Sequence, residues 1–280
     1  MFDFFDKQPK ELLGIDIGSK QIKMIELERP VDKKSVLKNY ALVLVKDADI
    51  REMTIEAVAN ILRQAIARAK IKTKDTVMSL PAFSTFLTLI KIQNMPEKEE
   101  ELEQLIQIEA KKYIPVPLEE VSLGWSRLNE EILLIAVPKD IVERYGQIAK
   151  EAGLELKALE AEMFSLTRSL ASGIKELTAI VDFGARSTNV SLAENGKVRM
   201  NRTMEEPNLE QIKAIIGPVV KKIILTGGRV DKTLISGFNN CQIGNPWQNI
   251  IYPQKLEQIL ISLSPSFAIA IGLALRDFNG

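Results

Sequence analysis

Two short polar turns, each following an apolar strand, carry the residue types that bind phosphate. The first is Asp16-Ile17-Gly18-Ser19-Lys20, and the second is Asp182-Phe183-Gly184-Ala185-Arg186-Ser187-Thr188. Glycine adopts backbone conformations closed to other residues, so the chain can approach a ligand closely at such a turn. We predict phosphate contacts through Gly18, Ser19, Lys20, Gly184, Ser187 and Thr188, with Lys23 as a further charge. Asp16 and Asp182 would hold Mg²⁺, largely through water.

Each turn taken alone is more typical of an ordinary hairpin, because motifs this short are weakly specific. The two turns, however, lie in matching contexts. The phrase at residues 14–23 returns at residues 180–190, and both copies read as strand, turn and second strand. This repeat predicts two related halves whose turns face one cleft, an arrangement that suits a nucleotide phosphate and its Mg²⁺.

A third glycine-rich element follows a short apolar strand late in the chain, at Thr226-Gly227-Gly228. A strand followed by Gly-Gly and a helix allows the backbone to pack against a base or ribose, so Gly227 and Gly228 are candidates for an adenosine contact. The alternative is a helix start that needs small residues. Glu160 and Glu162 could orient a water molecule near a terminal phosphate, although acidic residues also favour the first turn of a helix for electrostatic reasons.

Composition excludes several classes of function. The chain has 280 residues, 37 basic and 37 acidic side chains, no histidine and one cysteine, Cys241. A His/Cys metal site and a Ser-His triad are therefore excluded, and the zero net charge gives no reason to expect nucleic acid as the main partner. We expect no apolar run to approach the ~20 residues of a membrane span, and the N-terminus lacks a secretory signal pattern. We expect a cytoplasmic protein.

The hydrophobic periodicity predicts the same order of elements around each turn, with an extra module between the two copies. In the first half we expect strands at 12–17, 22–27, 36–45 and 76–80 and a helix at 55–69. In the second half we expect strands at 177–182, 188–192, 197–203 and 222–225 and a final helix at 265–275. Residues 81–155 would form an inserted α/β module, so that the subdomains are 1–80 with 156–176, 81–155, and 177–280.

These elements in this order resemble the actin/Hsp70/sugar-kinase superfamily. Three phrases narrow the resemblance to PilM, the actin-like cytoplasmic family of type IV pilus assembly: Leu12–Ser19, Tyr113–Val121 and Phe267–Arg276. The resemblance implies an α/β, actin-like (ribonuclease H-like, duplicated) fold with subdomains 1A, 1C (an SHS2-like insertion) and 2A. It also implies ATP and Mg²⁺ between the halves. A groove between 1A and 1C would hold the cytoplasmic N-terminal peptide of a PilN-like one-span membrane protein, which would bring the chain to the inner membrane beside other platform proteins.

One departure from the family pattern bears on the nucleotide. Only residues 205–221 lie where PilM proteins carry subdomain 2B, which leaves room for a single short helix and a vestigial 2B. At most a weak ATPase is expected, and no catalytic residue is assigned. A nucleotide-free scaffold of the GspL type and a small-molecule kinase of the same superfamily remain alternatives. Phe83, Phe86 and Tyr113 are candidate pocket residues for the peptide, with core packing as the alternative for at least two of them.

Overall fold

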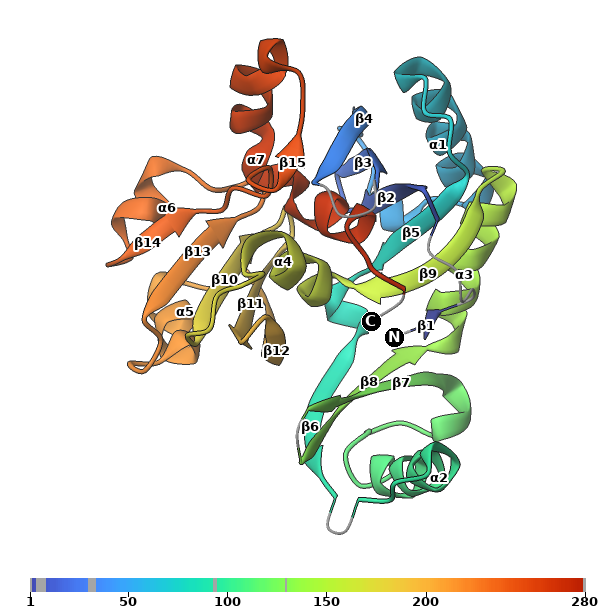
Figure 1. Ribbon diagram of the computed structural model, residues 1–280, viewed down its shortest axis with the longest axis vertical. Coiled ribbons are helices and arrows are strands. Elements are labelled where there is room, and N and C mark those ends of the chain that lie inside the picture. The colour runs from blue at the N-terminus through green and yellow to red at the C-terminus, as the bar shows by residue number, and fades with distance from the viewer. Residues whose placement is uncertain (1, 4–8, 30–33, 93–94, 129, 279–280) are drawn as a thin grey trace.

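The computed structural model describes residues 2–3, 9–29, 34–92, 95–128 and 130–278. Figure 1 shows two sheets as wings on either side of two central helices, with a third, smaller sheet and its helix below one wing. The wings are the two halves that the repeated turn predicts, and the smaller sheet comes from the segment between them.

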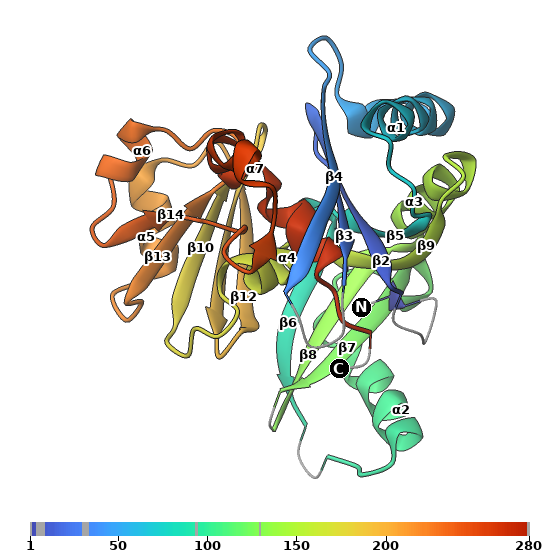
Figure 2. The same ribbon diagram turned by 45° about the horizontal axis from the view of Figure 1, so that its top comes forward.

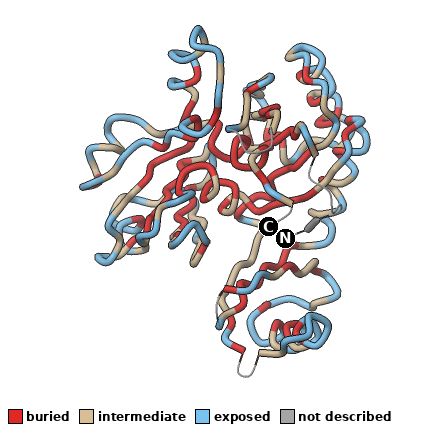
Figure 3. The backbone as a smooth tube through the Cα atoms, in the orientation of Figure 1, coloured by how far each residue is buried: buried red, intermediate tan, exposed pale blue. Residues whose placement is uncertain are grey.

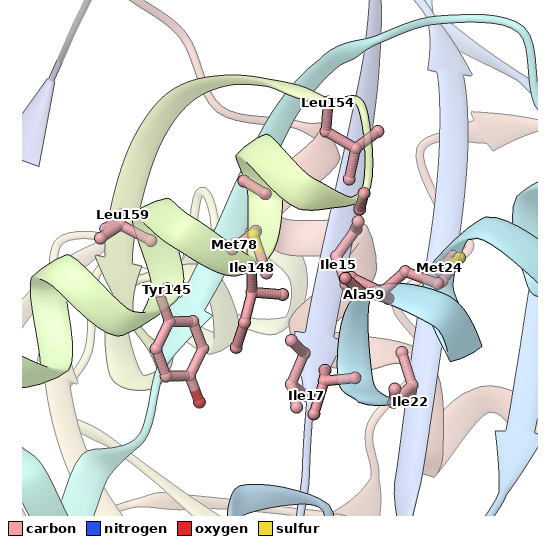
Figure 4. Packing of buried hydrophobic residues seen from close by; sticks show 14 of the residues in the cluster. Ile15, Ile17, Ile22, Met24, Ala59, Met78, Tyr145, Ile148, Leu154 and Leu159 are labelled. Atoms are coloured by element: carbon pink, nitrogen blue, oxygen red, sulfur yellow. The ribbon is translucent and has the colours of Figure 1, made fainter. Parts of the chain in front are cut away.

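The first-half sheet has the strand order β1-β9-β5-β2-β3-β4-β15. Helices α1 (Ile55–Ala69) and α3 (Lys139–Glu151) cover one face, and Figure 4 shows their side chains packed against Ile15, Met24 and Met78 of the sheet. The strands are β1 (Phe2–Asp3), β2 (Glu11–Ile17), β3 (Gln21–Glu28), β4 (Ser35–Leu44), β5 (Asp75–Leu80), β9 (Glu155–Ala161) and β15 (Ile250–Ile251).

The second-half sheet repeats this topology in the order β12-β11-β10-β13-β14, which matches β4-β3-β2-β5-β9. In both sheets three antiparallel strands are followed by two parallel ones. The duplication predicted from the repeat is therefore confirmed. The elements are β10 (Thr178–Phe183), β11 (Ser187–Glu194), β12 (Lys197–Glu205), α5 (Leu209–Ile216), β13 (Lys222–Thr226), α6 (Lys232–Ser236) and β14 (Cys241–Ile243). Within residues 205–221, α5 is the expected single short helix.

The inserted segment forms a three-stranded antiparallel sheet, β6-β8-β7, with one helix on one face. Its elements are β6 (Phe86–Lys91), α2 (Glu99–Ala110), β7 (Val121–Leu128) and β8 (Glu131–Pro138). Side chains of β8 alternate: Ile132 and Leu134 face α2, whereas Ile135 and Val137 join the first-half core. Helix α3 also packs into that core, so the C-terminal part of residues 81–155 is shared with the first half. The subdomain boundaries themselves remain a prediction.

Helices α4 (Glu162–Leu170) and α7 (Glu257–Ala274) lie between the two wings, as Figure 2 shows. They touch at Gly272, where a Cβ atom would overlap the backbone of Ser165. On its other side α7 packs so closely on β2 that a Cβ atom at Gly14 would overlap the carbonyl oxygen of Ala270. The C-terminal half of α7 is almost wholly buried, which places it among the red segments at the centre of Figure 3.

Three details differ from the sequence expectations. The last helix begins at Glu257 rather than at Pro265, because Pro265 sits inside it and its carbonyl accepts hydrogen bonds from Gly227 N and Thr226 Oγ1 instead. Strands β1 and β15 were not expected. The expectation that no apolar run is long enough for a membrane span was also wrong. Residues 254–274 form one helical segment that is long and apolar enough to cross a membrane, judged by length and composition alone. Half of that window is buried within the protein, as in a core helix.

The close contact at Gly272 gives a stability prediction. Gly272→Ala should lower the free energy of unfolding by about 3 kcal/mol or more, because the helices must separate to admit a methyl group. Urea unfolding followed by circular dichroism measures this. The matched control is Gly146→Ala in α3, where a Cβ atom meets nothing within 4 Å, and helix propensity predicts a gain of up to ~1 kcal/mol. Equal stability of the two variants would contradict the assigned packing.

Candidate functional site

A cavity of about 180 Å³ lies where the two repeated turns face each other. It is bounded by the β2–β3 turn, the β10–β11 turn, the loop after β13, the start of α4 and the middle of α7. The structure brings together nine of the ten residues predicted for the nucleotide and metal at its lining: Asp16, Gly18, Ser19, Lys20, Asp182, Gly184, Ser187, Gly227 and Gly228. Thr188 is buried beside them, and its hydroxyl accepts a hydrogen bond from Arg229 Nη2 at 3.3 Å. Their roles as ligands remain a prediction.

The two turns have the same hydrogen bond. Gly18 N donates to Gln21 O at 2.9 Å, and Gly184 N donates to Ser187 O at 2.9 Å. Each glycine therefore closes a tight turn between two antiparallel strands. The aspartate before it is the second-last residue of the strand that leads into the turn. Asp16 is opposite Lys23 in the sheet register, and Asp182 is opposite Asn189. The repeated phrase thus encodes repeated backbone geometry as well as similar residues.

Asp16 already has two partners. Lys23 Nζ lies 3.0 Å from its Oδ2 atom, and Ser79 Oγ donates to its Oδ1 atom at 3.0 Å. The pKa of Lys23 is raised because the ion pair with Asp16 outweighs the opposing effect of burial. Lys20 behaves differently, since its ammonium group donates to the carbonyl oxygens of Lys46 and Ala48. Lys23 is therefore the innermost cation of the site, and Lys20 lies at its rim.

The acidic floor of the cavity consists of Asp16, Asp182 and Glu162. Burial, together with the two aspartates, raises the pKa of Glu162 to about 8. Burial and Asp16 likewise raise the pKa of Asp182 to about 6, against the opposing effect of Lys23. Glu162 also accepts hydrogen bonds from Ala82 N at 3.2 Å and Asn189 Nδ2 at 3.4 Å. At neutral pH this floor holds a proton on Glu162, and a bound cation would favour its release.

Glu160 does not belong to this floor. Its side chain is fully buried and forms a bidentate pair with Arg168 at 2.8 and 2.9 Å, and it also accepts a hydrogen bond from Arg276. Burial would raise the pKa of Glu160, but the arginines lower it. Glu160 therefore joins the end of α7 to β9 and α4 and has no free oxygen to orient a water molecule. Of the two glutamates considered from sequence, only Glu162 reaches the cavity.

Three arginines complete the lining: Arg51, Arg186 and Arg229. Sequence reasoning assigned none of them a role, although Arg186 lies inside the second turn and Arg229 follows Gly228 directly. Together with Lys20 and Lys23 they place five basic side chains around three carboxyl groups. Basic groups at the rim and carboxylates on the floor suit a phosphate chain that carries a divalent cation.

Gly227 and Gly228 have different tasks. Gly227 has φ +98°, and a Cβ atom there would overlap the backbone of Phe183 and the carboxylate of Asp182. It is therefore required for the loop to pack on the second turn. At Gly228 a Cβ atom would meet only the side chains of Gln21 and Ser266, no closer than 3.7 Å. Gly228 is the glycine that leaves open space at the cavity.

The donor set fits phosphate better than it fits a whole nucleoside triphosphate. Drug-sized ligands occupy pockets of about 300–1,000 Å³, which is larger than this cavity. Among the described residues, no group of three or more Asp, Glu, His or Cys side chains is arranged to hold a metal directly. Mg²⁺ would reach Asp16 and Asp182 through water, with Lys23 shifting from Asp16 towards the phosphate.

A second cavity of about 590 Å³ adjoins the first and shares Arg51, Arg186 and Ser187 with it. It lies between α1, α3 and the entry to the inserted module. Its lining is mixed. One part is apolar and includes Ile50, Val58, Phe83, Ile141 and Ile148, and the other is charged or polar and includes Arg144 of α3 and Glu205 of β12. Arg186 crosses from the second half to Asp49 at 2.7 Å and Glu52 at 3.1 Å, so the second turn is tied to the wall of this cavity.

Comparison with known proteins identifies the family. The family model described as type IV pilus assembly protein PilM matches residues 14–206, which is well over half of the chain. The chain belongs to the PilM family. The resemblance seen in the three sequence phrases is thus confirmed, and it places the duplicated fold, the two turns and the inserted module within one family pattern.

Solved structures agree with this PilM-family fold. A structure described as the PilM-PilN type IV pilus biogenesis complex matches with a TM-score of 0.80 and 21% identity, covering 97% of this chain and 100% of the other. The cytoplasmic domain of EpsL, from the type II secretion system of Vibrio cholerae, has a TM-score of 0.53 and 12% identity over 90% and 93% of the two chains. A Bacteroides thetaiotaomicron protein with an actin-like ATPase fold has a TM-score of 0.54 and 11% identity, over 95% and 96%. The α/β, actin-like fold is confirmed.

The raised pKa of Glu162 predicts how stability depends on pH. The folded state holds a proton that the unfolded state, with the ordinary value of 4.5, releases at lower pH. Stability should therefore fall as pH rises from about 4.5 to about 8. Glu162→Gln removes this dependence and should be about 1–3 kcal/mol more stable than wild type at pH 8.5 but not at pH 4. Thermal unfolding across this range measures it. Glu143→Gln, at an exposed position, serves as control. If the stability of all three proteins changes with pH in the same way, the raised pKa of Glu162 is wrong.

Proposed function

We propose that this chain is a cytoplasmic actin-like scaffold of a type IV pilus or type II secretion-like inner-membrane platform. Its task would be to bind the cytoplasmic N-terminal peptide of a PilN-like membrane protein and to join that protein to other platform proteins. The observation that carries the proposal is PilM family membership together with a partly apolar cavity where the inserted module meets the first half. The similarity to a chain of the PilM-PilN type IV pilus biogenesis complex supports the choice of partner.

The three aromatic residues considered as peptide contacts differ in their surroundings. Phe83 lines the 590 Å³ cavity, is 55% exposed, and has the guanidinium of Arg51 4.8 Å above its ring. Phe86 packs against the core of the inserted module. Tyr113 is exposed at the end of α2 and lies outside the cavity lining. Phe83 is therefore our candidate anchor for an apolar side chain of the peptide, flanked by Ile141 and Ile148 of α3.

Nucleotide is the second part of the proposal. ATP with Mg²⁺ would place its phosphates in the 180 Å³ cavity, near Gly18, Ser19, Gly184 and Ser187, and its adenosine against Gly228 on the open side. The reduced 2B segment gives the base little wall, so weak binding is expected. Because Arg186 belongs to both cavities, a phosphate that attracts it would loosen its pairs with Asp49 and Glu52. Nucleotide would in this way adjust the peptide cavity.

A nucleotide-free scaffold is the main alternative, and the charges in the 180 Å³ cavity support it. Lys23 already neutralises Asp16, and the proton on Glu162 reduces the charge of the floor further. The charge of the floor is therefore partly balanced without a bound cation. A small-molecule kinase is less favoured, because the short α5 leaves the second half without a closing subdomain.

The nucleotide proposal is tested by fluorescent ATP analogue binding with and without Mg²⁺. Asp182→Ala should abolish the Mg²⁺-dependent part of the binding, since it removes one of the two carboxylates proposed to hold the hydrated ion. Asp140→Ala, an exposed carboxylate at the start of α3, is the control and should leave binding unchanged. Unchanged affinity in Asp182→Ala would refute the metal assignment. Absence of binding by the wild type would favour the nucleotide-free scaffold.

The partner proposal is tested by calorimetric titration with N-terminal tail peptides of one-span proteins encoded beside this chain. We expect micromolar affinity, about −8 kcal/mol. Phe83→Ala should weaken binding about tenfold or more, since a buried aromatic anchor is a typical hot spot. Tyr113→Ala is the matched control, being exposed and outside the cavity. If Tyr113→Ala weakens binding and Phe83→Ala does not, the peptide site lies elsewhere on the inserted module.

A further inference from the structure

The inserted module has an open groove that is separate from both cavities described above. The groove has a volume of about 1180 Å³ and lies between α2 and β7. It exists because one helix cannot cover the whole face of a three-stranded sheet: α2 packs over Ile132 and Leu134 of the central strand and leaves the β7 side partly uncovered. Leu118, Leu123 and Trp125 are consequently only half-buried and form an apolar floor.

Strand β7 is an edge strand with an accessible backbone. Among the residues that the structure describes, β7 pairs only with β8, in a continuous register from Val121 to Leu128. Proteins usually protect such edges with proline, lysine or a bulge. The segment Val121–Ser126 contains no proline and no charged residue, and its pairing with β8 shows no bulge. Its outward N–H and C=O groups are therefore available to another extended chain.

The rim of the groove opposite β7 is acidic. Glu99, Glu100 and Glu103 of α2 line it and are exposed, and no cation in the described part of the chain pairs with them. The one lysine at this rim, Lys98, is paired with Glu101 at 3.0 Å. Favourable interaction with the helix dipole accounts for acidic residues in the first turn of α2. It does not account for Glu103, nor for the apolar floor and open edge on the other side of the groove.

We propose that this groove binds an extended, basic segment of a partner protein, which adds to β7 as a fourth antiparallel or parallel strand. The backbone of the segment would pair with the edge of β7. The basic side chains, which alternate along the segment, would point towards α2, where their charged ends would meet the glutamates and their aliphatic stems would cover Leu123 and Trp125. Strand addition derives affinity from main-chain hydrogen bonds and specificity from alternate side chains. The eight residues of β7 span about 27 Å, so a segment of six to eight residues is sufficient.

The acidic rim also distinguishes among occupants. A second copy of this chain that paired β7 with β7 in a two-fold arrangement would bring two sets of glutamates together, and like charges at close range are unfavourable. A basic segment instead gains attraction that weakens as salt increases. The proposal does not depend on nucleotide or on the peptide at Phe83, because it uses a different face of the module.

The test uses a fluorescein-labelled peptide, Lys-Ile-Arg-Leu-Lys-Val-Arg-Leu, and fluorescence anisotropy with the full chain at 50 mM salt. We expect micromolar binding that weakens at least fivefold at 300 mM salt, and at least tenfold weaker binding of the same peptide with glutamate at its four basic positions. Two N-methylated versions, modified at odd or at even positions, each block one edge of the peptide. One version should lose binding and the other should keep it, since only one edge faces β7.

Variants of the protein show where the labelled peptide binds. The double change Glu99→Lys and Glu103→Lys should weaken binding at least tenfold, whereas Glu210→Lys and Glu151→Lys together, on exposed sites far from the groove, should leave it unchanged. Failure of the basic peptide to bind below 1 mM, retention of binding by both N-methylated versions, or equal affinity of the two double variants would overturn the proposal. So would loss of binding in Phe83→Ala alone, which places the probe in the other cavity. A concentration-dependent dimer abolished by the groove changes would assign the surface to a second copy.

Discussion

The structure depends on the close crossing of α4 and α7 between the two sheets. At this crossing Gly272 lies against the backbone of Ser165, and Gly14 of β2 lies against the other side of α7. No side chain larger than a hydrogen atom fits at either position, so the distance between the wings is set by backbone contact. The buried Glu160 then locks the end of α7 through Arg168 and Arg276. Because each wing ends in a polar turn at this crossing, the spacing of the helices also sets the width of the cavity between the turns.

Charge within the cavity is balanced by the chain itself. Lys23 pairs with Asp16, and the high pKa of Glu162 keeps a proton on the third carboxyl group at neutral pH. An uncompensated buried charge is costly, so a site that must exist without a ligand needs this balance. If the proposed phosphate and divalent cation bind, the same arrangement would permit exchange, because Lys23 would turn to the phosphate and Glu162 would lose its proton.

Much of the fold could be predicted from the sequence because the repeat is local. Asp16-Ile17-Gly18 and Asp182-Phe183-Gly184 each encode a strand and its turn, and duplication of the strand order followed from them. Contacts between distant segments could not be predicted in this way. Pro265 suggested a helix start, yet tertiary packing carries α7 through it and uses its carbonyl for the Gly-Gly loop. Arg51 has no motif around it and reaches the site only through folding. Glu160 and Glu162 look alike in sequence. They differ because Glu160 lies in β9 and pairs with Arg168 and Arg276, whereas Glu162 is the first residue of α4 and lines the cavity.

Arg186 is the point at which the two proposed sites meet. Its guanidinium is half-exposed at the lip of the 180 Å³ cavity, the proposed phosphate site, and is paired with Asp49 and Glu52 on the wall of the 590 Å³ cavity, the proposed peptide site. Glu162 makes a similar connection, since it lines the phosphate cavity and accepts a hydrogen bond from Ala82, the first residue of the turn that carries Phe83 into the peptide cavity. We therefore expect a change of charge in one cavity to affect the other through two direct contacts. These are the ion pairs of Arg186 and the hydrogen bond from Ala82 to Glu162. Coupling through a few short polar links is compatible with a rigid crossing of α4 and α7, because it requires only side-chain exchange at the cavity walls.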